Sequence, residues 1–339
     1  MYFIFINDND LHLDYYLFSI PLCNSGISSR FDVAQFNGGN TMILRIIFIT
    51  ATVIPVAVSP VVNADESLFG YVKGAETLPQ GAWQFAQTVT YRTDKGTGNY
   101  DAWNTKSEIE YGVTNRFTAA GYLKMQAIDT SGLVIDGYLP GDKDYGLKPS
   151  GVEGSMKYNF LSPAKDDFGL SGYAAFSYDW LDAHSGQGKN KYSLETELLA
   201  QKYFMEGQLI WVGNAGVEST YAKRDEIAGL PPGFDWPEDA EMEIELKFGS
   251  GLSYRFAPNW FIGAEVLYET EFETEVGQER WSWFAGPTLH YGGSRIWASL
   301  TWLPQLRGGG EMYPGQPDTD LHLIEKTEQE IRFRFGIAF

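Results

Sequence analysis

The sequence has few residues of the kinds that build disulfide frameworks or metal sites. Among 339 residues there is one cysteine, Cys23, and there are four histidines. A single cysteine cannot form an internal disulfide, and a metal site needs several ligands at close spacing. No apolar run reaches the roughly 20 residues that a helix needs to cross a bilayer. We therefore expect no disulfide, no metal or cofactor site and no membrane-spanning helix.

Positive charge is also scarce. The chain has 25 Lys and Arg against 44 Asp and Glu, which gives a net charge of −19. Such a balance argues against binding nucleic acid and against attachment to anionic lipid surfaces. Aromatic residues, by contrast, make up 15% of the chain, and there are 37 glycines. The composition therefore excludes a nucleic-acid partner and turns attention to the aromatic segments.

One apolar stretch, residues 46–62, has the features of a secretory signal. It contains two prolines, follows Met42 and Arg45, and leads into a V-x-A motif that ends at Ala64. A positive n-region, an apolar h-region and small residues at the cleavage site are typical of a signal peptide. A buried core helix is the alternative, which the prolines disfavour. We therefore expect a signal peptide over residues 42–64.

This signal divides the rest of the chain. A signal peptide belongs at the true N-terminus, so we expect translation to start at Met42 and residues 1–41 to be a mis-called extension. Cys23 lies in that extension, so the mature chain from Asp65 has no cysteine, which suits an oxidising periplasm. The predicted mature segments are a periplasmic N-terminal segment over 65–80 and a barrel over 81–339.

From Gly81 onward, apolar and polar residues alternate in about twelve segments. Trp260 and Ile262, for example, share one face of their segment, and Glu265 and Glu269 share the other. Short connections alternate with longer ones, which is typical of outer-membrane barrels. The short ones are 114–116, 162–167, 205–207, 257–259 and 292–294, and the longer ones are 93–103, 129–150, 181–191, 222–241, 274–280 and 305–325.

Two features predict that the apolar face points outward to lipid. About twelve strands enclose an interior too wide to fill with apolar side chains, since about eight already leave room only for packed side chains or one small ligand. Aromatic residues also gather at segment ends, such as Trp83 and Phe204 near short connections and Trp180 near a long one. The predicted fold is all-β: an antiparallel transmembrane β-barrel of about 12 strands, with short periplasmic turns and long extracellular loops, in the outer membrane of a Gram-negative bacterium.

Three stretches resemble a largely uncharacterised proteobacterial family of outer-membrane barrels. They are ETLPQGAW (76–83), LSYRFAPNWFIGAEVLYE (252–269) and FAGPTLHYGGSRIWASLTWLPQL (284–306). More distantly, they are similar to transporters associated with aromatic-compound degradation of the phenol meta-pathway type. The likeness spans most of residues 70–339 and consists of turn and girdle signatures. It implies a membrane location and a transport role, and it supplies no ligand and no catalytic residue.

Histidines are the candidates for catalysis or metal binding. His184 and Ser185 lie in a long connection, but the H-x-S-N-G pattern of outer-membrane phospholipase is absent, and adjacent residues of an extended segment point to opposite faces. His290 and His322 lack metal-ligand spacing. We therefore expect no enzyme activity, no metal and no cofactor. Five loop carboxylates are expected to be solvated or to contact divalent ions in lipopolysaccharide: Asp142, Asp144, Asp235, Glu238 and Asp239.

The inward face of the predicted barrel is charged. Carboxylates recur at positions i and i+2, and basic residues, Lys157 among them, lie deeper along the strands. A ring of one sign in a pore concentrates counter-ions and biases selectivity. We expect an acidic outer vestibule above a more basic zone, in a channel for passive passage of small cationic or neutral solutes. The predicted pore-lining residues are Glu108, Glu110, Glu195, Glu197, Glu243, Glu245, Lys247, Arg255, Glu265, Glu269, Glu271, Glu328, Glu330, Arg332 and Arg334.

The last segment carries a further expectation. Ile331, Phe333, Phe335, Ile337 and Phe339 share one face and close the chain on an aromatic residue, which matches the terminal signature that barrel-assembly machinery recognises. The expected partners are therefore this machinery, outer-membrane lipid and lipopolysaccharide, and a small-molecule solute. Two alternatives stay open: a lipid hydrolase with its site at the barrel rim, and a sealed structural barrel whose inward charges neutralise one another.

Overall fold

The computed structural model describes residues 68–134, 142–226, 239–273, 277–312, 315–316 and 318–339. The expected extension and signal peptide, residues 1–64, lie outside these ranges, as do the loop carboxylates Asp235 and Glu238. All described residues belong to one compact unit, residues 55–339. None of their helices is long and apolar enough to cross a membrane.

The described chain is built from strands that run to as many as 18 residues. The strands are β1 (Trp83–Thr93), β2 (Thr97–Thr114), β3 (Phe117–Val134), β4 (Asp144–Leu161), β5 (Gly169–Leu181), β6 (Gly188–Phe204), β7 (Leu209–Arg224), β8 (Glu241–Ala257), β9 (Trp260–Glu273), β10 (Gly277–Gly292), β11 (Ile296–Gly310) and β12 (Gln329–Ala338), with a 3₁₀ turn, η1 (Met205–Gly207), between β6 and β7.

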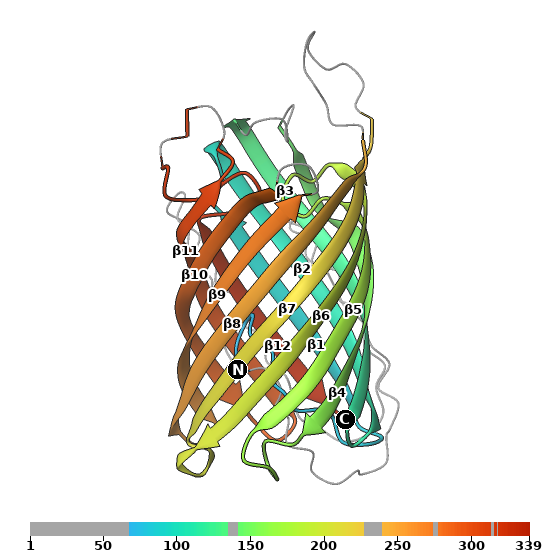
Figure 1. The fold of residues 1–339 in the computed structure, drawn as a ribbon, viewed down its shortest axis with the longest axis vertical. Helices are drawn as coiled ribbons and strands as arrows, with labels where there is room; N and C mark the ends of the chain where they lie inside the picture. Colours follow the sequence, from blue (N-terminus) through green and yellow to red (C-terminus); the bar gives the residue numbers. More distant parts are fainter. Residues whose placement is uncertain (1–67, 135–141, 227–238, 274–276, 313–314, 317) are drawn as a thin grey trace, which may run out of the picture. The chain divides into compact units, whose positions relative to one another are not determined.

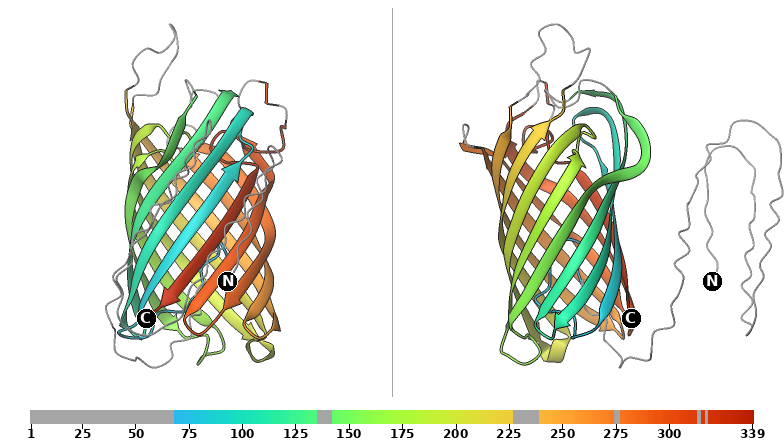
Figure 2. Two further views of the ribbon diagram at one scale, coloured as in Figure 1. Left: turned by 180° about the vertical axis from the view of Figure 1, so that it is seen from behind. Right: turned by 90° about the vertical axis from the view of Figure 1, so that its right-hand side faces the viewer.

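These strands close into one antiparallel barrel (Figures 1 and 2). Each strand pairs with its sequence neighbours, and β1 pairs with β12, so that Phe85 lies opposite Ile337 and Tyr91 opposite Ile331. Closure leaves no unpaired sheet edge. The predicted fold class, an antiparallel barrel of twelve strands, is confirmed.

The two ends of the barrel differ. At one end, here called the short-turn end, the connections are 115–116, 162–168, 205–208, 258–259 and 293–295. The first strand, β1, begins at this end, and the last strand, β12, finishes there. At the other, the long-loop end, the connections are 94–96, 135–143, 182–187, 225–240, 274–276 and 311–328.

Several strands extend further than the sequence predicted. The expected loop 93–103 is wrong, because β2 already begins at Thr97 and the connection is Asp94 to Gly96. Asp94 and Gly96 both have positive φ, which makes this tight turn. Likewise, β3 and β4 continue into the expected loop 129–150. Backbone hydrogen bonds between neighbouring strands do not require an apolar face, so polar residues near the mouth of the barrel can remain in the sheet.

Side chains alternate across the wall as expected. Phe176 is 56% exposed and Ile262 is 54% exposed on the outer surface, while Ser171, Gln126 and Thr301 are fully buried on the inner one. Apolar outside and polar inside is the pattern of a barrel surrounded by lipid. Aromatic pairs such as Trp83 and Tyr111, with ring centroids 4.5 Å apart, lie on strands at the short-turn end.

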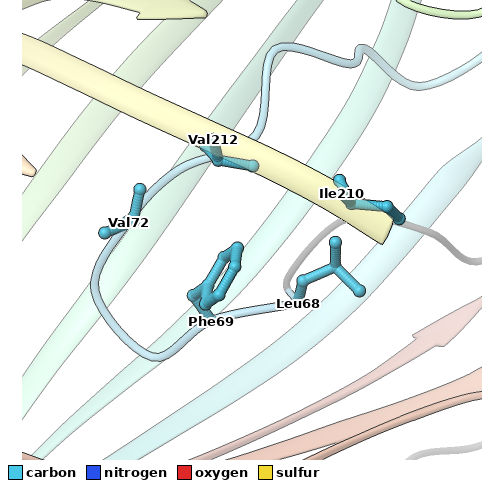
Figure 3. Packing of buried hydrophobic residues seen from close by; sticks show 5 residues of the cluster. All are labelled: Leu68, Phe69, Val72, Ile210 and Val212. Atoms are coloured by element: carbon cyan, nitrogen blue, oxygen red, sulfur yellow. The ribbon is translucent and has the colours of Figure 1, made fainter. Parts of the chain in front are cut away.

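The N-terminal segment before β1 lies inside the barrel, where the sequence had indicated a separate periplasmic segment. Leu68, Phe69 and Val72 pack against Ile210 and Val212 on the inner face of β7 (Figure 3). A Cβ atom on Gly251 would lie 2.7 Å from the Phe69 ring, so a glycine in the wall lets the ring approach. We call residues 68–80 the lumen segment.

Candidate functional site

The lumen segment is held chiefly by Glu265 of β9. Its carboxylate accepts hydrogen bonds from the backbone N–H groups of Gly70 and Tyr71 at 2.9 Å and of Val72 at 3.0 Å. It also accepts hydrogen bonds from the hydroxyl groups of Thr288 on β10 and Thr301 on β11. Glu265 is 2% exposed. Hydrogen bonds to an ionised carboxylate are among the stronger ones in proteins, so this residue is the main anchor of the segment.

Polar side chains of the wall bind further backbone groups of the segment. Asn214 accepts the Lys73 N–H at 2.7 Å and donates to the Lys73 carbonyl at 2.8 Å. Gln201 and Asn159 bond the N–H and the carbonyl of Ala75, both at 2.8 Å. An irregular segment inside a barrel needs such partners, because its backbone makes no ladder of its own.

Charged contacts tie the segment to opposite sides of the lumen. Lys73 Nζ lies 2.8 Å from Glu197 and 3.3 Å from Glu195 on β6. The Tyr71 hydroxyl donates to Glu330 at 2.5 Å, and the Arg332 guanidinium lies over the Tyr71 ring at 3.5 Å. The lumen segment therefore spans from β6 to β12 and narrows the interior.

A cavity of about 430 Å³ lies in the lumen. The lumen segment borders it through Tyr71 and Lys73, and two connections of the long-loop end border it through His184 and through Glu325 and Lys326. Wall strands supply the remaining lining, which is rich in Lys, Arg, Asp and Glu. The cavity is therefore a charged chamber between inward segments of both barrel ends.

Ion pairs hold the long-loop connection 311–328 onto the wall. Lys326 Nζ lies 2.6 Å from Glu269 and 3.2 Å from Glu245. Burial lowers the pKa of Lys326, but these two carboxylates outweigh it and hold that pKa above its usual value. Glu325 lies 2.7 Å from Arg280 of β10. Two adjacent loop residues thus bind two oppositely charged parts of the wall.

Of the histidines within the described ranges, His184 makes no hydrogen bond with its neighbour Ser185. The Ser185 hydroxyl donates to Asp182 at 2.9 Å rather than to His184. His184 is buried, and its burial, with Lys95 and Arg92 nearby, lowers its pKa well below the usual range. His290 and His322 are buried in different parts of the wall and loop. Within the described ranges, no group of three or more His, Cys, Asp or Glu could hold a metal ion.

Most of the predicted pore-lining residues meet partners on the inner face. Glu330 pairs with Arg92 at 3.1 Å, Lys247 pairs with Glu218 and Glu245, Glu271 binds Arg280, and Arg334 lies 4.0 Å from Glu108. Glu110 accepts from Gln84 at 3.4 Å, and Glu243 lies 3.8 Å from Arg280.

Two predicted residues lie apart from this group. Arg255 is exposed near the short-turn end, and its backbone N–H donates to the Gln208 carbonyl. Glu328 precedes β12 in the connection, and its carboxylate accepts from the neighbouring Gln329 side chain. Arg255 lies near the end of β8 and Glu328 lies directly before β12. Near the end of a strand, the alternation of side chains no longer fixes which way a side chain points.

Other lumen residues were not singled out from the sequence. Lys106 and Lys124 share the inward face of their strands, and the alternation that identified Glu108 could have identified Lys106, two positions before it. Lys73 and Lys326 come from segments outside the strands. No periodic pattern could have placed these two in the lumen.

Comparison with known proteins identifies the family but no activity. A model of a family of unknown function, DUF6662, matches residues 61–339, and no curated protein matches. The outer membrane channel COG4313 from Pseudomonas putida F1 is similar over 78% of this chain and 98% of its own, with 12% identity and a TM-score of 0.50. The NanC porin is similar over 75% and 98%, with 12% identity and a TM-score of 0.41. At such identity the likeness concerns the fold. The chain belongs to the DUF6662 family, whose function is unknown.

Proposed function

We propose that the chain is an outer-membrane channel for the passive passage of small polar solutes through its charged lumen. The observation that carries this proposal is the chamber of about 430 Å³, which is lined by many Lys, Arg, Asp and Glu side chains inside a closed barrel with an apolar outer surface. A polar interior with an apolar exterior suits a water-filled path through lipid. Its charges would set which solutes enter.

The lumen segment is the proposed restriction of this path. It lies inside the barrel and is bound by Glu265, Asn214 and Gln201. All three bonds are to backbone groups, so water can replace them when the segment shifts. Passage is therefore expected to be slow in the resting arrangement and faster when the segment leaves the wall.

The sealed barrel is the second candidate, and the density of ion pairs favours it. Lys73, Lys247 and Lys326 each contact two or more carboxylates within the lumen. A lumen filled by such paired side chains would leave no continuous path for a solute. The rim hydrolase has no comparable support, because His184 is buried beside the chamber and its neighbour Ser185 is bonded to Asp182.

Solute uptake distinguishes the channel from the sealed barrel. The mature protein from Asp65 is refolded into liposomes, and swelling is measured with small polar solutes and with a large sugar. The channel predicts swelling with the small solutes, faster in a variant that lacks residues 65–80. Absence of swelling in both proteins, with folding verified by circular dichroism, would establish the sealed barrel instead.

A further inference from the structure

The connection that leads into β12 crosses the opening of the barrel at the long-loop end. We call residues 318–328 of this connection the lid segment. Three of its buried residues pack against Leu133, near the end of β3: Leu321, Leu323 and Ile324. Lys326 of the same segment binds Glu269 of β9 at 2.6 Å. In the closed order of strands, β3 and β9 lie six strands apart, so the lid segment contacts opposite walls of the opening.

The inner side of the lid segment borders the chamber. Glu325 and Lys326 both line it, and so does His184 of the connection 182–187 at the same end of the barrel. The lumen segment, which precedes β1 at the short-turn end, lines the same chamber through Tyr71 and Lys73. The chamber therefore lies between two irregular segments, one from each end of the barrel.

Hydrogen bonds and ion pairs hold the lid segment against the wall. The Gln305 side chain of β11 donates to the carbonyls of His322 and Thr327, at 2.9 and 3.2 Å. The same side chain accepts a hydrogen bond from the His322 N–H at 2.7 Å. Glu325 adds an ion pair with Arg280 of β10 at 2.7 Å. These contacts favour the arrangement in which the lid segment covers the chamber.

The covering arrangement also buries polar atoms that lack partners. Thr327 is 0% exposed, and its hydroxyl has no hydrogen-bond partner among the described residues. His322 is 1% exposed, and in the described part of the chain its Nδ1 has no partner either. Water would bond both atoms once they were exposed, so their burial opposes closure. Attractive contacts and unmet polar groups thus act against each other, and the lid segment is poised to open.

We propose that the lid segment is a gate at the long-loop end, in series with the lumen segment. Outer-membrane barrels turn their long loops to the cell exterior, so a solute from outside meets the lid segment before it reaches the chamber. The lid segment must open for entry, and the lumen segment must shift for exit. The role in transport rests on the proposed channel, whereas the covering of the chamber by the lid segment does not.

Cysteine labelling tests the gate without relying on transport. The mature chain from Asp65 has no cysteine, so Thr88→Cys places a single thiol in the chamber wall. A small charged methanethiosulfonate is added to the refolded mature protein in detergent. Lys326→Glu brings a third carboxylate beside Glu245 and Glu269, and the repulsion is expected to raise the labelling rate about tenfold. Equal rates with and without Lys326→Glu, in proteins whose β-sheet content is unchanged, would overturn the proposal.

Further variants test the contacts in both directions. Addition of Glu269→Lys to Lys326→Glu restores an ion pair of reversed order, so the labelling rate should return toward the parent value, and failure of this rescue would contradict the pair as a latch. Lys223→Glu makes the same charge change at an exposed position at the long-loop end of β7, and as the control it should leave the rate unchanged.

Thr327→Val is the opposite change, because it removes the unbonded hydroxyl at nearly constant shape. The closed lid segment should then be more stable, and labelling of Thr88→Cys should slow about threefold. This variant keeps every ion pair of the segment and does not depend on the folding of Lys326→Glu. Labelling as fast as in the parent protein, or faster, would contradict the proposed balance between contacts and unmet polar groups.

Liposome swelling separates the gate from the proposed function. Swelling with small solutes, together with a labelling rate that Lys326→Glu leaves unchanged, would refute the gate and leave the channel standing. Faster labelling in Lys326→Glu without swelling in any variant would refute the channel and leave the covering role of the lid segment standing.

Discussion

The Glu265 carboxylate accepts the backbone N–H of Tyr71 at 2.9 Å, across 194 positions of sequence. It is one of three consecutive N–H groups that the same carboxylate holds. The contact joins the middle of β9 to the lumen segment, which lies inside the barrel and is not part of its wall. This one side chain therefore supplies three of the hydrogen bonds that hold the lumen segment.

Glu265→Gln should loosen the lumen segment. The amide has one acceptor oxygen and a donor nitrogen, so it cannot hold three backbone N–H groups, and hydrogen bonds to a charged acceptor contribute about 1.5–3 kcal/mol each. We expect faster hydrogen exchange over residues 68–75 and a several-fold rise in solute uptake. Glu273→Gln on the same strand lies at the long-loop end and is the matched control. Unchanged exchange in Glu265→Gln would show that Glu265 is not the anchor.

Lys326→Gln should release the connection 311–328 from the wall. Removal of the ammonium leaves Glu245 without one cation and Glu269 without the cation that lies 2.6 Å away. The repulsion between carboxylates should then open the long-loop end. Hydrogen exchange over residues 318–328 is expected to accelerate at least several-fold, with β-sheet content unchanged. Exposed Lys165→Gln, in a short turn, provides the comparison, and the same protection in both variants would count against the contact.

The burial of Lys95 predicts that the stability of the protein depends on pH. Its side chain is 1% exposed in the connection 94–96, and burial lowers its pKa to about 7. An unfolded lysine titrates near pH 10.4, so between about pH 7 and 10 the unfolded state binds more protons than the folded state. The free energy of unfolding should therefore rise with pH through this window.

Lys95→Met should remove this rise and increase the free energy of unfolding at pH 7 by a few kcal/mol, because the cost of burying an ammonium disappears. Equilibrium urea unfolding in lipid vesicles, repeated between pH 6 and 10, measures both effects. Parallel pH profiles of the variant and the parent protein would contradict the assignment to Lys95.

Deletion of Phe339 should impair assembly before it affects transport. Phe339 is exposed on the outer surface, and its backbone exchanges two hydrogen bonds with Trp83 of β1, which close the barrel at the short-turn end. Ile331, Phe333 and Ile337 are exposed on the same face, as the proposed signal for barrel-assembly machinery requires. In cells we expect less folded protein in the outer membrane. Normal insertion of the truncated chain into the membrane would contradict the proposal that this strand carries the assembly signal.

The strand pattern of this barrel could be predicted from sequence because its side chains alternate with period two. The inward direction of Glu245 and the outward direction of Ile262 both follow from that rule. The strand ends could not, because β2 continues from Thr97 through a polar, glycine-containing stretch whose buried residues, Tyr100 and Ala102, pack against Ile128 of β3. These contacts and the hydrogen bonds between the two strands keep the stretch in the sheet.

The arrangement of charge in the lumen depends on pairings that no local pattern contains. Sequence placed Glu245 and Glu269 in the lumen, but Lys326, which joins them, comes from an irregular connection. The expected axial order, acidic above basic, was drawn from single strands, whereas which charges meet depends on which strands are neighbours after closure. The lumen segment was missed for the same reason.

Conductance in planar bilayers tests the central claim most directly. The mature protein from Asp65 and a variant lacking residues 65–80 are compared in the same salt and lipid. The channel predicts discrete conductance steps for the mature protein and larger steps for the variant, because the lumen segment restricts the path. Insertion of both proteins without any conductance step would contradict the claim that this barrel is a channel.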